Sequence, residues 1–279
     1  MSNDNTLVLG ATGKTGRRVV ARLRLRGTPV RPASRSGQVP FDWSDPSGWD
    51  AALTGVDAVY LVAPQVPGPA PDFVARAEAA GVRRLVLLSG RAADDWGDSG
   101  FGLDMLSAEE AVRGSALEWT VLRSNNFQQN FDEELWHAPL VAGELALPAD
   151  AVPEPFTDVE DVADTAVRVL AEPGKHAGRI YELSGPRAIT FAEAVGMISS
   201  ASGLPMTYRT ISPAEYTRNL VDDGVDEDVA HHVSAMFVMM ERGPLATTTD
   251  GIDTVLGRPP RPFEEYVVRA AAAGAWSGR

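Results

Sequence analysis

The chain has 279 residues and a mass of 29.7 kDa, a length that suits one large α/β domain or a main domain with a smaller lobe. It contains no cysteine, which excludes disulfides, thiolate nucleophiles, iron–sulfur clusters and cysteine-based zinc sites. The net charge of −13 argues against nucleic acids and anionic membranes as partners, because both attract basic proteins.

The charge is unevenly distributed along the chain. Residues 1–41 hold eight lysines and arginines against one acid, Asp4, so their net charge is +7 and the rest of the chain carries −20. The first residues are polar and lead into a short apolar run rather than a secretion signal, and no window reaches 18 apolar residues. We therefore expect a cytoplasmic protein without a membrane segment.

The first 125 residues alternate short apolar runs with amphipathic stretches, a rhythm typical of a parallel sheet built from β-α-β units. Strands are predicted at Thr6–Leu9, Pro29–Ala33, Ala58–Ala63, Arg84–Ser89 and Trp119–Arg123, and helices at Thr15–Arg26, Asp72–Ala80 and Leu103–Gly114. Further on, the pattern predicts one strand at Arg179–Ser184 and helices at Val159–Ala171, Phe191–Ser202, Pro213–Asp222, Glu227–Arg242 and Pro262–Ala273.

Three glycines spaced as GxxGxxG, Gly10, Gly13 and Gly16, follow the first predicted strand and open a helix. Glycines at this turn let a pyrophosphate approach the backbone, and the helix N-terminus offers free N–H groups to the anion. The placement favours dinucleotide binding over a glycine-rich turn without a ligand. We therefore expect a doubly wound Rossmann sheet with a smaller, mostly helical C-terminal lobe. Residues 1–130, with 156–185 returning to them, form the cofactor domain; residues 131–155 and 186–279 form the substrate lobe.

The end of the second predicted strand indicates which dinucleotide is bound. NAD enzymes usually place an acid there to bind the ribose 2′-hydroxyl, but no acid occurs between Asp4 and Asp42. Ser34-Arg35-Ser36 stands at this position instead, and a guanidinium flanked by hydroxyls suits a 2′-phosphate. The sequence thus predicts NADP(H) as the cofactor. The other arginines of the first helix, 17, 18, 22, 24 and 26, are expected on its solvated side.

The usual catalytic pair of short-chain dehydrogenases, Tyr-x-x-x-Lys, is excluded. The chain has two lysines; Lys14 lies in the glycine loop, and four residues before Lys175 stands Ala171. The four histidines form no HExxH motif, so no metal site is predicted. No serine lies in a GxSxG elbow, so no serine nucleophile of that kind is predicted. Hydride transfer without a protein acid requires an electron-poor acceptor such as an iminium ion, a quinone or a quinone methide.

Several segments in series resemble the NmrA-like branch of atypical short-chain dehydrogenases. They are GATGKTG at 10–16, Arg35, LVLLSG at 85–90, the stretch from Glu110 through Arg123 to Asn130, FTDVEDVA at 156–163 and LGRPPRPF at 256–263. Within that branch the chain is most similar to bacterial NAD(P)H-binding proteins grouped with agroclavine dehydrogenases, and more distantly to NADPH quinone reductases. The resemblance implies a Rossmann domain, a small C-terminal lobe and a cofactor in the cleft between them. It leaves two functions open, because some relatives are reductases and others bind the dinucleotide as sensors.

The resemblance also implies roles for single positions. The pyrophosphate residues are Gly10, Thr12, Gly13, Lys14, Thr15 and Gly16, the 2′-phosphate residues Ser34 and Arg35, and Asp42 approaches the adenine. Ala63 and Pro64 lie under the adenosine ribose, Ser89 and Phe127 lie near the nicotinamide, and Ser89 and Asn126 are the catalytic candidates. The chain departs from the family in two places: Ser124-Asn125 follows Arg123 where Arg-Pro is frequent, and the histidine that is frequent near the helix before Glu110 is missing.

A substrate pocket is the last expectation. Methionines and aromatic residues could wall an adaptable apolar pocket or form plain core; the candidates are Trp96, Phe101, Met105, Trp136, Met236 and Met240. Arg123 is expected to be structural and paired with an acid, whereas Glu109 and Glu110 are expected on a solvated face. The leading hypothesis is an NADPH-dependent oxidoreductase acting on a planar, apolar, electron-poor small molecule; the alternative is a catalytically silent NADP(H) sensor.

Overall fold

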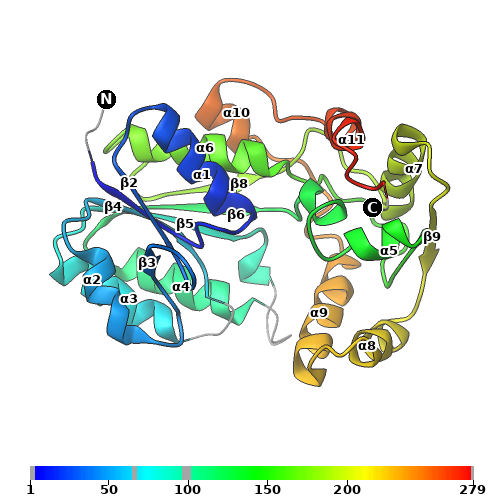
Figure 1. Ribbon diagram of the computed structural model, residues 1–279, viewed down its shortest axis with the longest axis horizontal. Helices are drawn as coiled ribbons and strands as arrows, with labels where there is room; N and C mark the ends of the chain where they lie inside the picture. The colour runs from blue at the N-terminus through cyan, green and yellow to red at the C-terminus, as the bar shows by residue number, and fades with distance from the viewer. Residues whose placement is uncertain (1–3, 65–67, 96–101, 278–279) are drawn as a thin grey trace.

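The computed structural model describes residues 4–64, 68–95 and 102–277. Its main part is a seven-stranded parallel sheet in the order β3-β2-β1-β4-β5-β6-β8 (Figure 1). The strands are β1 (Thr6–Leu9), β2 (Val30–Ser34), β3 (Val39–Pro40), β4 (Ala58–Val62), β5 (Arg84–Gly90), β6 (Glu118–Ser124) and β8 (Arg179–Leu183). Apolar runs buried on both faces of the sheet explain why these segments pair in parallel.

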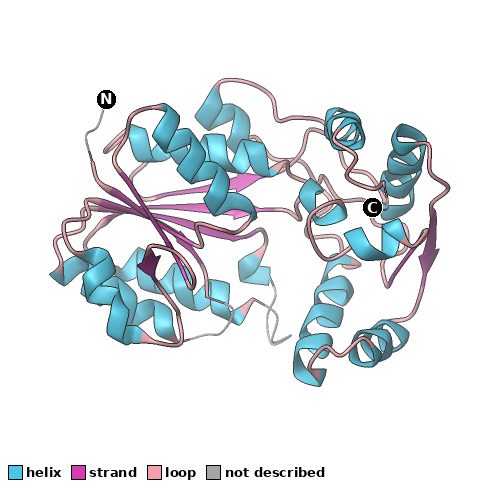
Figure 2. Cartoon of the chain, in the orientation of Figure 1, coloured by secondary structure: helices cyan, strands magenta, loops and turns pink. Residues whose placement is uncertain are grey.

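Helices cover both faces of the sheet, so the predicted doubly wound α/β fold is confirmed (Figure 2). One face packs on α1 (Lys14–Leu25), α6 (Val159–Ala171) and α10 (Gly251–Leu256). The other packs on α2 (Trp49–Leu53), α3 (Pro69–Ala79) and α4 (Leu103–Gly114), with short 3-10 turns at η1 (Pro46–Gly48) and η2 (Ala93–Asp95).

The remaining elements form a smaller lobe around an aromatic core of their own. They are η4 (Gln128–Phe131), α5 (His137–Val141), α7 (Phe191–Ser202), α8 (Pro213–Asp222), α9 (Glu227–Met240) and α11 (Phe263–Ala272), with a two-stranded parallel sheet of β7 (Glu144–Leu147) and β9 (Thr207–Thr210). Trp136 is fully buried in this core against Phe131 and Phe191. It stabilises the lobe and is not among the residues that line the cavity described below.

Helix α10 departs from the predicted lobe boundary at residue 186. Its buried residues Ile252 and Val255 pack with α1, α6 and the sheet rather than with the small lobe. Gly251 makes this approach possible, because a Cβ there would lie 2.2 Å from the carbonyl oxygen of Glu182 in β8. The chain therefore returns to the sheet a second time before α11 closes the small lobe.

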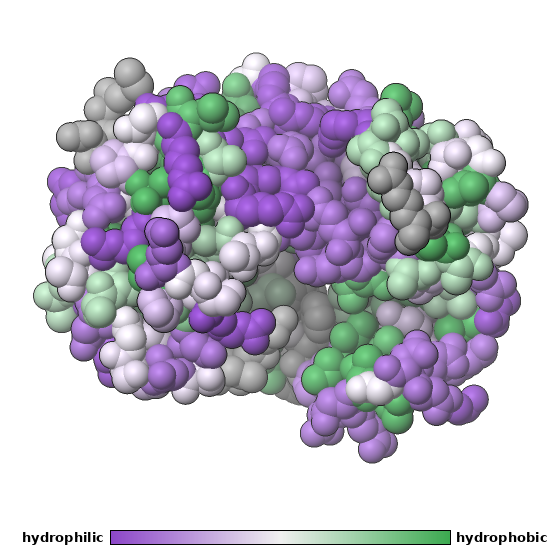
Figure 3. Space-filling model, in the orientation of Figure 1, coloured by the Kyte–Doolittle hydropathy of each residue, from purple (hydrophilic) through white to green (hydrophobic). Residues whose placement is uncertain are grey.

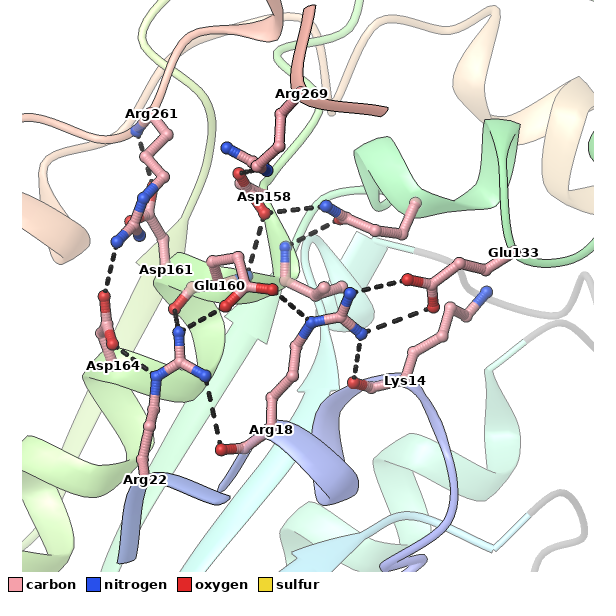
Figure 4. Close-up of polar contacts among 12 residues, drawn as sticks. Lys14, Arg18, Arg22, Glu133, Asp158, Glu160, Asp161, Asp164, Arg261 and Arg269 are labelled. Carbon is pink, nitrogen blue, oxygen red and sulfur yellow. Dashed lines mark hydrogen bonds and ion pairs between the residues drawn. The ribbon is translucent and has the colours of Figure 1, made fainter. Parts of the chain in front are cut away.

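The first two turns of α6 bind arginines from three other segments (Figure 4). Glu160 pairs with Arg18 and Arg22 of α1, each at 2.5 Å, and Arg22 also reaches Asp164 at 2.6 Å. Arg18 pairs in addition with Glu133, which follows η4, at 2.6 Å. These two arginines were expected on a solvated side of α1; their role is instead to tie α1 to α6 and to the small lobe.

The same turns of α6 also hold the C-terminal segment. Arg258 and Arg261 each pair with Asp161 and Asp164. One turn earlier, Asp158 accepts from Arg269 of α11 at 2.7 Å. Asp158 and Asp161 are almost completely buried, so their charges are offset by these arginines.

No helix within the described ranges is long and apolar enough to cross a membrane.

Replacing Glu160 tests whether this network stabilises the fold. Burial acts to raise the pKa of Glu160, but hydrogen bonds from Arg22 and Arg18 outweigh it and hold the pKa below the ordinary 4.5. A lowered pKa stabilises the fold above the ordinary value, and this contribution is lost as the pH falls through the native pKa. Glu160→Gln should therefore lower the free energy of unfolding by about 1–3 kcal/mol at pH 7, with a difference from wild type that shrinks below about pH 4.

Denaturant titrations at a series of pH values measure this difference. The control is Glu144→Gln, because Glu144 pairs with Arg209 where both side chains are half exposed, and its loss should cost no more than about 0.5 kcal/mol. A Glu160→Gln difference that stays constant from neutral to acidic pH would contradict the assignment.

Candidate functional site

The glycine loop between β1 and α1 has the geometry of an anion cradle. Gly10 adopts a positive φ of 63°, and a Cβ on Gly16 would lie 2.2 Å from the carbonyl oxygen of Gly10, so only glycine fits there. Gly13 caps α1 without a side-chain hydrogen bond, and the first turn holds no acid. The first N–H groups of a twelve-residue helix are thus open to a phosphate, which fits the pyrophosphate of a dinucleotide.

A second feature lies where β2 ends. A cleft of about 300 Å³ lies between the end of β2 and α1; its lining includes Thr12, Ser34, Gly37 and Gln38. Arg17 and Arg24 of α1 also border it, and both are exposed, as the sequence predicted. Their seven-residue spacing, two helical turns, could have signalled a shared face.

Two other predicted cofactor residues near this cleft are at the surface. Arg35 is exposed at the turn that follows β2. Asp42 accepts hydrogen bonds from the N–H and hydroxyl of Ser44, which lower the pKa of its carboxyl. Asp42 therefore has an ordered, ionised carboxylate in the segment that follows β3.

A cavity of about 390 Å³ lies between the sheet and the small lobe. Met236, Met239 and Met240 line it from one face of α9, at helical spacings of three and four residues, and Met105 lines it from α4. Figure 3 shows hydrophobic residues gathered beside the hollow over α9 and α8. The other lining residues are Lys14, Val62, Leu88, Ser89, Gly90, Arg91, Ser124, Asn125, Asn126, Phe127, Asn130, Leu135, Pro244 and Leu245.

The structure thus brings most of the predicted nicotinamide and pocket residues together. Ser89, Asn126, Phe127, Met105, Met236 and Met240 share this one cavity. Ala63 and Pro64 directly follow β4, whose last residue Val62 lines the cavity. Trp96 and Phe101 lie outside the described residues. Arg91 and Asn125 also line the cavity and were not predicted to do so.

A chain of buried polar groups runs from the cavity into the protein at the end of β5. The Ser89 hydroxyl donates to Glu109 at 2.6 Å, and Glu109 accepts from Arg123 at 2.6 Å. Arg123 also binds the exposed Asp94 at 2.7 Å. The hydrogen bond to Glu109, with Asp94 adding to it, raises the pKa of Arg123 although burial opposes the shift. Arg123 is therefore structural and paired with acids, as expected, but Glu109 is 1% exposed and not on a solvated face.

A second chain of this kind follows β6. Glu154, 2% exposed, accepts from the side-chain amides of Asn125 and Asn126 at 3.1 and 3.0 Å and from the backbone N–H of Asn126 at 2.8 Å. Arg91 donates to the other end of the Asn125 amide at 2.9 Å. Burial raises the pKa of Glu154, and these N–H groups act against the shift.

Lys14 connects the glycine loop to the cavity. Its ammonium donates to Asn130 at 2.5 Å, pairs with Glu134 at 2.9 Å and lies 6.0 Å from the centre of the Phe127 ring. The side chain thus reaches from the loop across to the segment after β6. Among the described residues no cluster of three or more histidines or acids could hold a metal ion.

Comparisons with known proteins agree with this arrangement. The family described as NAD(P)H-binding matches residues 10–173. The chain is 35% identical to (4-alkanoyl-5-oxo-2,5-dihydrofuran-3-yl)methyl phosphate reductase of Streptomyces griseus, over 96% of this chain and 98% of that protein. It is 31% identical to festuclavine synthase I of Penicillium roqueforti, over 93% and 96% of the two chains. Among solved structures it is similar to the NADPH-dependent quinone oxidoreductase QOR2 of Escherichia coli in complex with NADPH, with a TM-score of 0.80 and 24% identity over 95% and 99% of the two chains.

We expect the two acids that pair with Arg123 to contribute very differently to the free energy of unfolding. Glu109→Gln deletes a carboxylate that is 1% exposed and leaves a buried guanidinium with less compensation, so the free energy of unfolding should fall by about 2–4 kcal/mol. Asp94→Asn changes a side chain that is 63% exposed and should cost about 1 kcal/mol or less. Urea unfolding of both variants measures the difference, and equal costs would show that burial does not govern this pair.

Proposed function

The chain belongs to the NAD(P)H-binding family and is an NAD(P)H-dependent oxidoreductase, and we propose that it transfers hydride from NADPH to a planar, apolar, electron-poor molecule such as an iminium ion or a quinone. The observation that carries the proposal is the position of the cavity. Lys14 belongs to the glycine loop and also lines the methionine-rich cavity, so the glycine loop and the cavity adjoin each other. An apolar, adaptable wall of this kind suits a planar aromatic substrate.

The cofactor-binding roles follow from the loop and the end of β2. The open N–H groups at the start of α1 bind the pyrophosphate, and Ser34 with Arg35 binds the 2′-phosphate. Bound dihydronicotinamide supplies the hydride. The carboxyl ends of β4, β5 and β6 place Val62, Ser89 and Asn126 around the cavity, where ligands of open α/β sheets usually bind.

The protein's share of the reaction is positioning and exclusion of water. The described residues that line the cavity include no tyrosine, and the chain has no Tyr-x-x-x-Lys pair. An electron-poor substrate needs no protein acid for hydride addition, because the accepting carbon is already activated. The Streptomyces griseus relative is named as a reductase of a substituted dihydrofuranone, which supports an electron-poor acceptor.

The consumption of NADPH with a panel of quinones and cyclic imines tests this function. We expect turnover with at least one member of the panel, followed as loss of dihydronicotinamide absorbance. Tight NADPH binding without turnover of any acceptor would contradict the reductase and favour an NADP(H) sensor.

Charge reversal at Arg35 tests the preference for NADPH. Arg35→Glu should weaken NADPH binding about tenfold or more, because a carboxylate repels the 2′-phosphate, and should change NADH binding little. Arg26→Glu makes the same charge change at an exposed position at the far end of α1 and should leave both affinities within about threefold. Equal losses for the two cofactors in Arg35→Glu, measured by titration calorimetry, would refute the assignment.

A further inference from the structure

Two polar groups that line the cavity are each bound to a buried carboxylate. The Ser89 hydroxyl donates its proton to Glu109 at 2.6 Å, and Glu109 is held on its other side by Arg123. A carboxylate can only accept, so the proton of Ser89 is directed away from the cavity. Ser89 therefore presents lone pairs, not a proton, to a bound molecule.

The carboxamide of Asn126 is oriented in the same way by Glu154. The N–H groups of Asn125 and Asn126 occupy both oxygens of Glu154, so each amide turns its nitrogen toward that carboxyl. Arg91, which can only donate, fixes the oxygen of Asn125 on the other side. The Oδ1 atom of Asn126 makes no hydrogen bond that is recorded among the described residues, and Asn126 lines the cavity.

We propose that Ser89 and Asn126 form a pair of hydrogen-bond acceptors that selects a substrate with an N–H group next to the hydride-accepting carbon, as in a protonated imine. Glu109 and Glu154 are the positioning residues, because they turn the donor groups of Ser89 and Asn126 away from the cavity. The inference rests on the proposed function and narrows its substrate class. Both groups stand where neighbouring strands end, because Ser89 pairs in register with Arg123 and Gly90 with Ser124. The two acceptors thus approach one cavity from adjacent strands.

The chemistry balances without a proton donor. Hydride adds two electrons to the carbon of the C=N⁺ bond, a C–H bond forms, and the π electrons of C=N⁺ move to nitrogen. The product is a neutral amine that keeps its N–H, and NADPH becomes NADP⁺. Neither Ser89 nor Asn126 has to give up a proton, which agrees with their orientation as acceptors.

Two substrates of equal charge separate hydrogen bonding from simple attraction of a cation. Protonated 3,4-dihydroisoquinoline carries an N–H, and N-methyl-3,4-dihydroisoquinolinium has a methyl group there. We expect wild type to favour the N–H substrate about tenfold or more in kcat/KM, the size of a hydrogen bond to a charged group. Asn126→Leu and Ser89→Ala should each lower this ratio several-fold, mainly through the KM of the N–H substrate.

Glu154→Gln tests the positioning role. A glutamine has an NH2 group of its own, so the Asn126 amide is free to turn over and the substrate ratio should fall several-fold. Loss of folded protein alone would lower both rates equally and leave the ratio unchanged. Glu144→Gln is the control, since it makes the same change at a half-exposed residue that does not line the cavity and should leave the ratio as in wild type.

A wild-type ratio near one would overturn the inference, and so would a ratio that Asn126→Leu and Glu154→Gln leave unchanged. In either case, turnover of one of the substrates would still support the proposed reductase activity. A binding measurement covers the case without turnover. Calorimetry with NADP⁺ present compares 1,2,3,4-tetrahydroisoquinolinium, which has N–H groups, with its N,N-dimethyl analogue. A preference for the former that disappears in Asn126→Leu would uphold the acceptor pair although the hydride proposal had failed; equal binding would reject it.

Discussion

The pairing of the acidic first turns of α6 with arginines is the interaction on which the arrangement of the two lobes depends. Asp158, Glu160, Asp161 and Asp164 together bind five arginines, namely Arg18, Arg22, Arg258, Arg261 and Arg269. These arginines come from α1, from the segment after α10 and from α11. Burial makes the pairing strict, because an unpaired charge at Asp158 or Asp161 would be strongly destabilising. Helix α6 thus fixes both α1 and the C-terminal stretch that leads into α11, which are far apart in the sequence.

The same network positions the cavity. Arg18 donates to the carbonyl oxygen of Lys14 and pairs with Glu133, so the start of α1 is held against the chain that leaves η4. Asp158 accepts from the side chain of Gln129, and the backbone of Phe127 pairs with Thr157 just before α6. The glycine loop, the end of β6 and the small lobe are therefore connected through α6. Charged residues outside the lining of the cavity thus hold the glycine loop against the segment that follows β6.

The sequence predicted the long elements well, because their periodicity depends on burial against a sheet. Helices Leu103–Gly114, Val159–Ala171, Phe191–Ser202 and Pro213–Asp222 have the predicted bounds. Short strands with a buried apolar run, such as β1, were predicted, whereas β3, β9 and α10 were missed because they have no such run and span too few positions for a period to be recognised. The return of α10 to the sheet was missed for the same reason, since α10 has only six residues and its partner β8 lies some 70 residues earlier.

Charged residues were harder to place than apolar ones because the sequence does not show what lies opposite them. Glu109 and Glu110 are adjacent and chemically alike, yet Glu109 is buried on Arg123 whereas Glu110 is exposed. One helical step of about 100° separates the two outcomes, and the deciding residue lies on another strand. Each buried carboxylate also directs the hydrogen bonds of its neighbours, as Glu109 does for Ser89 and Glu154 for Asn126. Buried residues behind the lining of the cavity thus decide which lining groups donate and which accept hydrogen bonds. A sequence motif that contains only the lining residues does not include them.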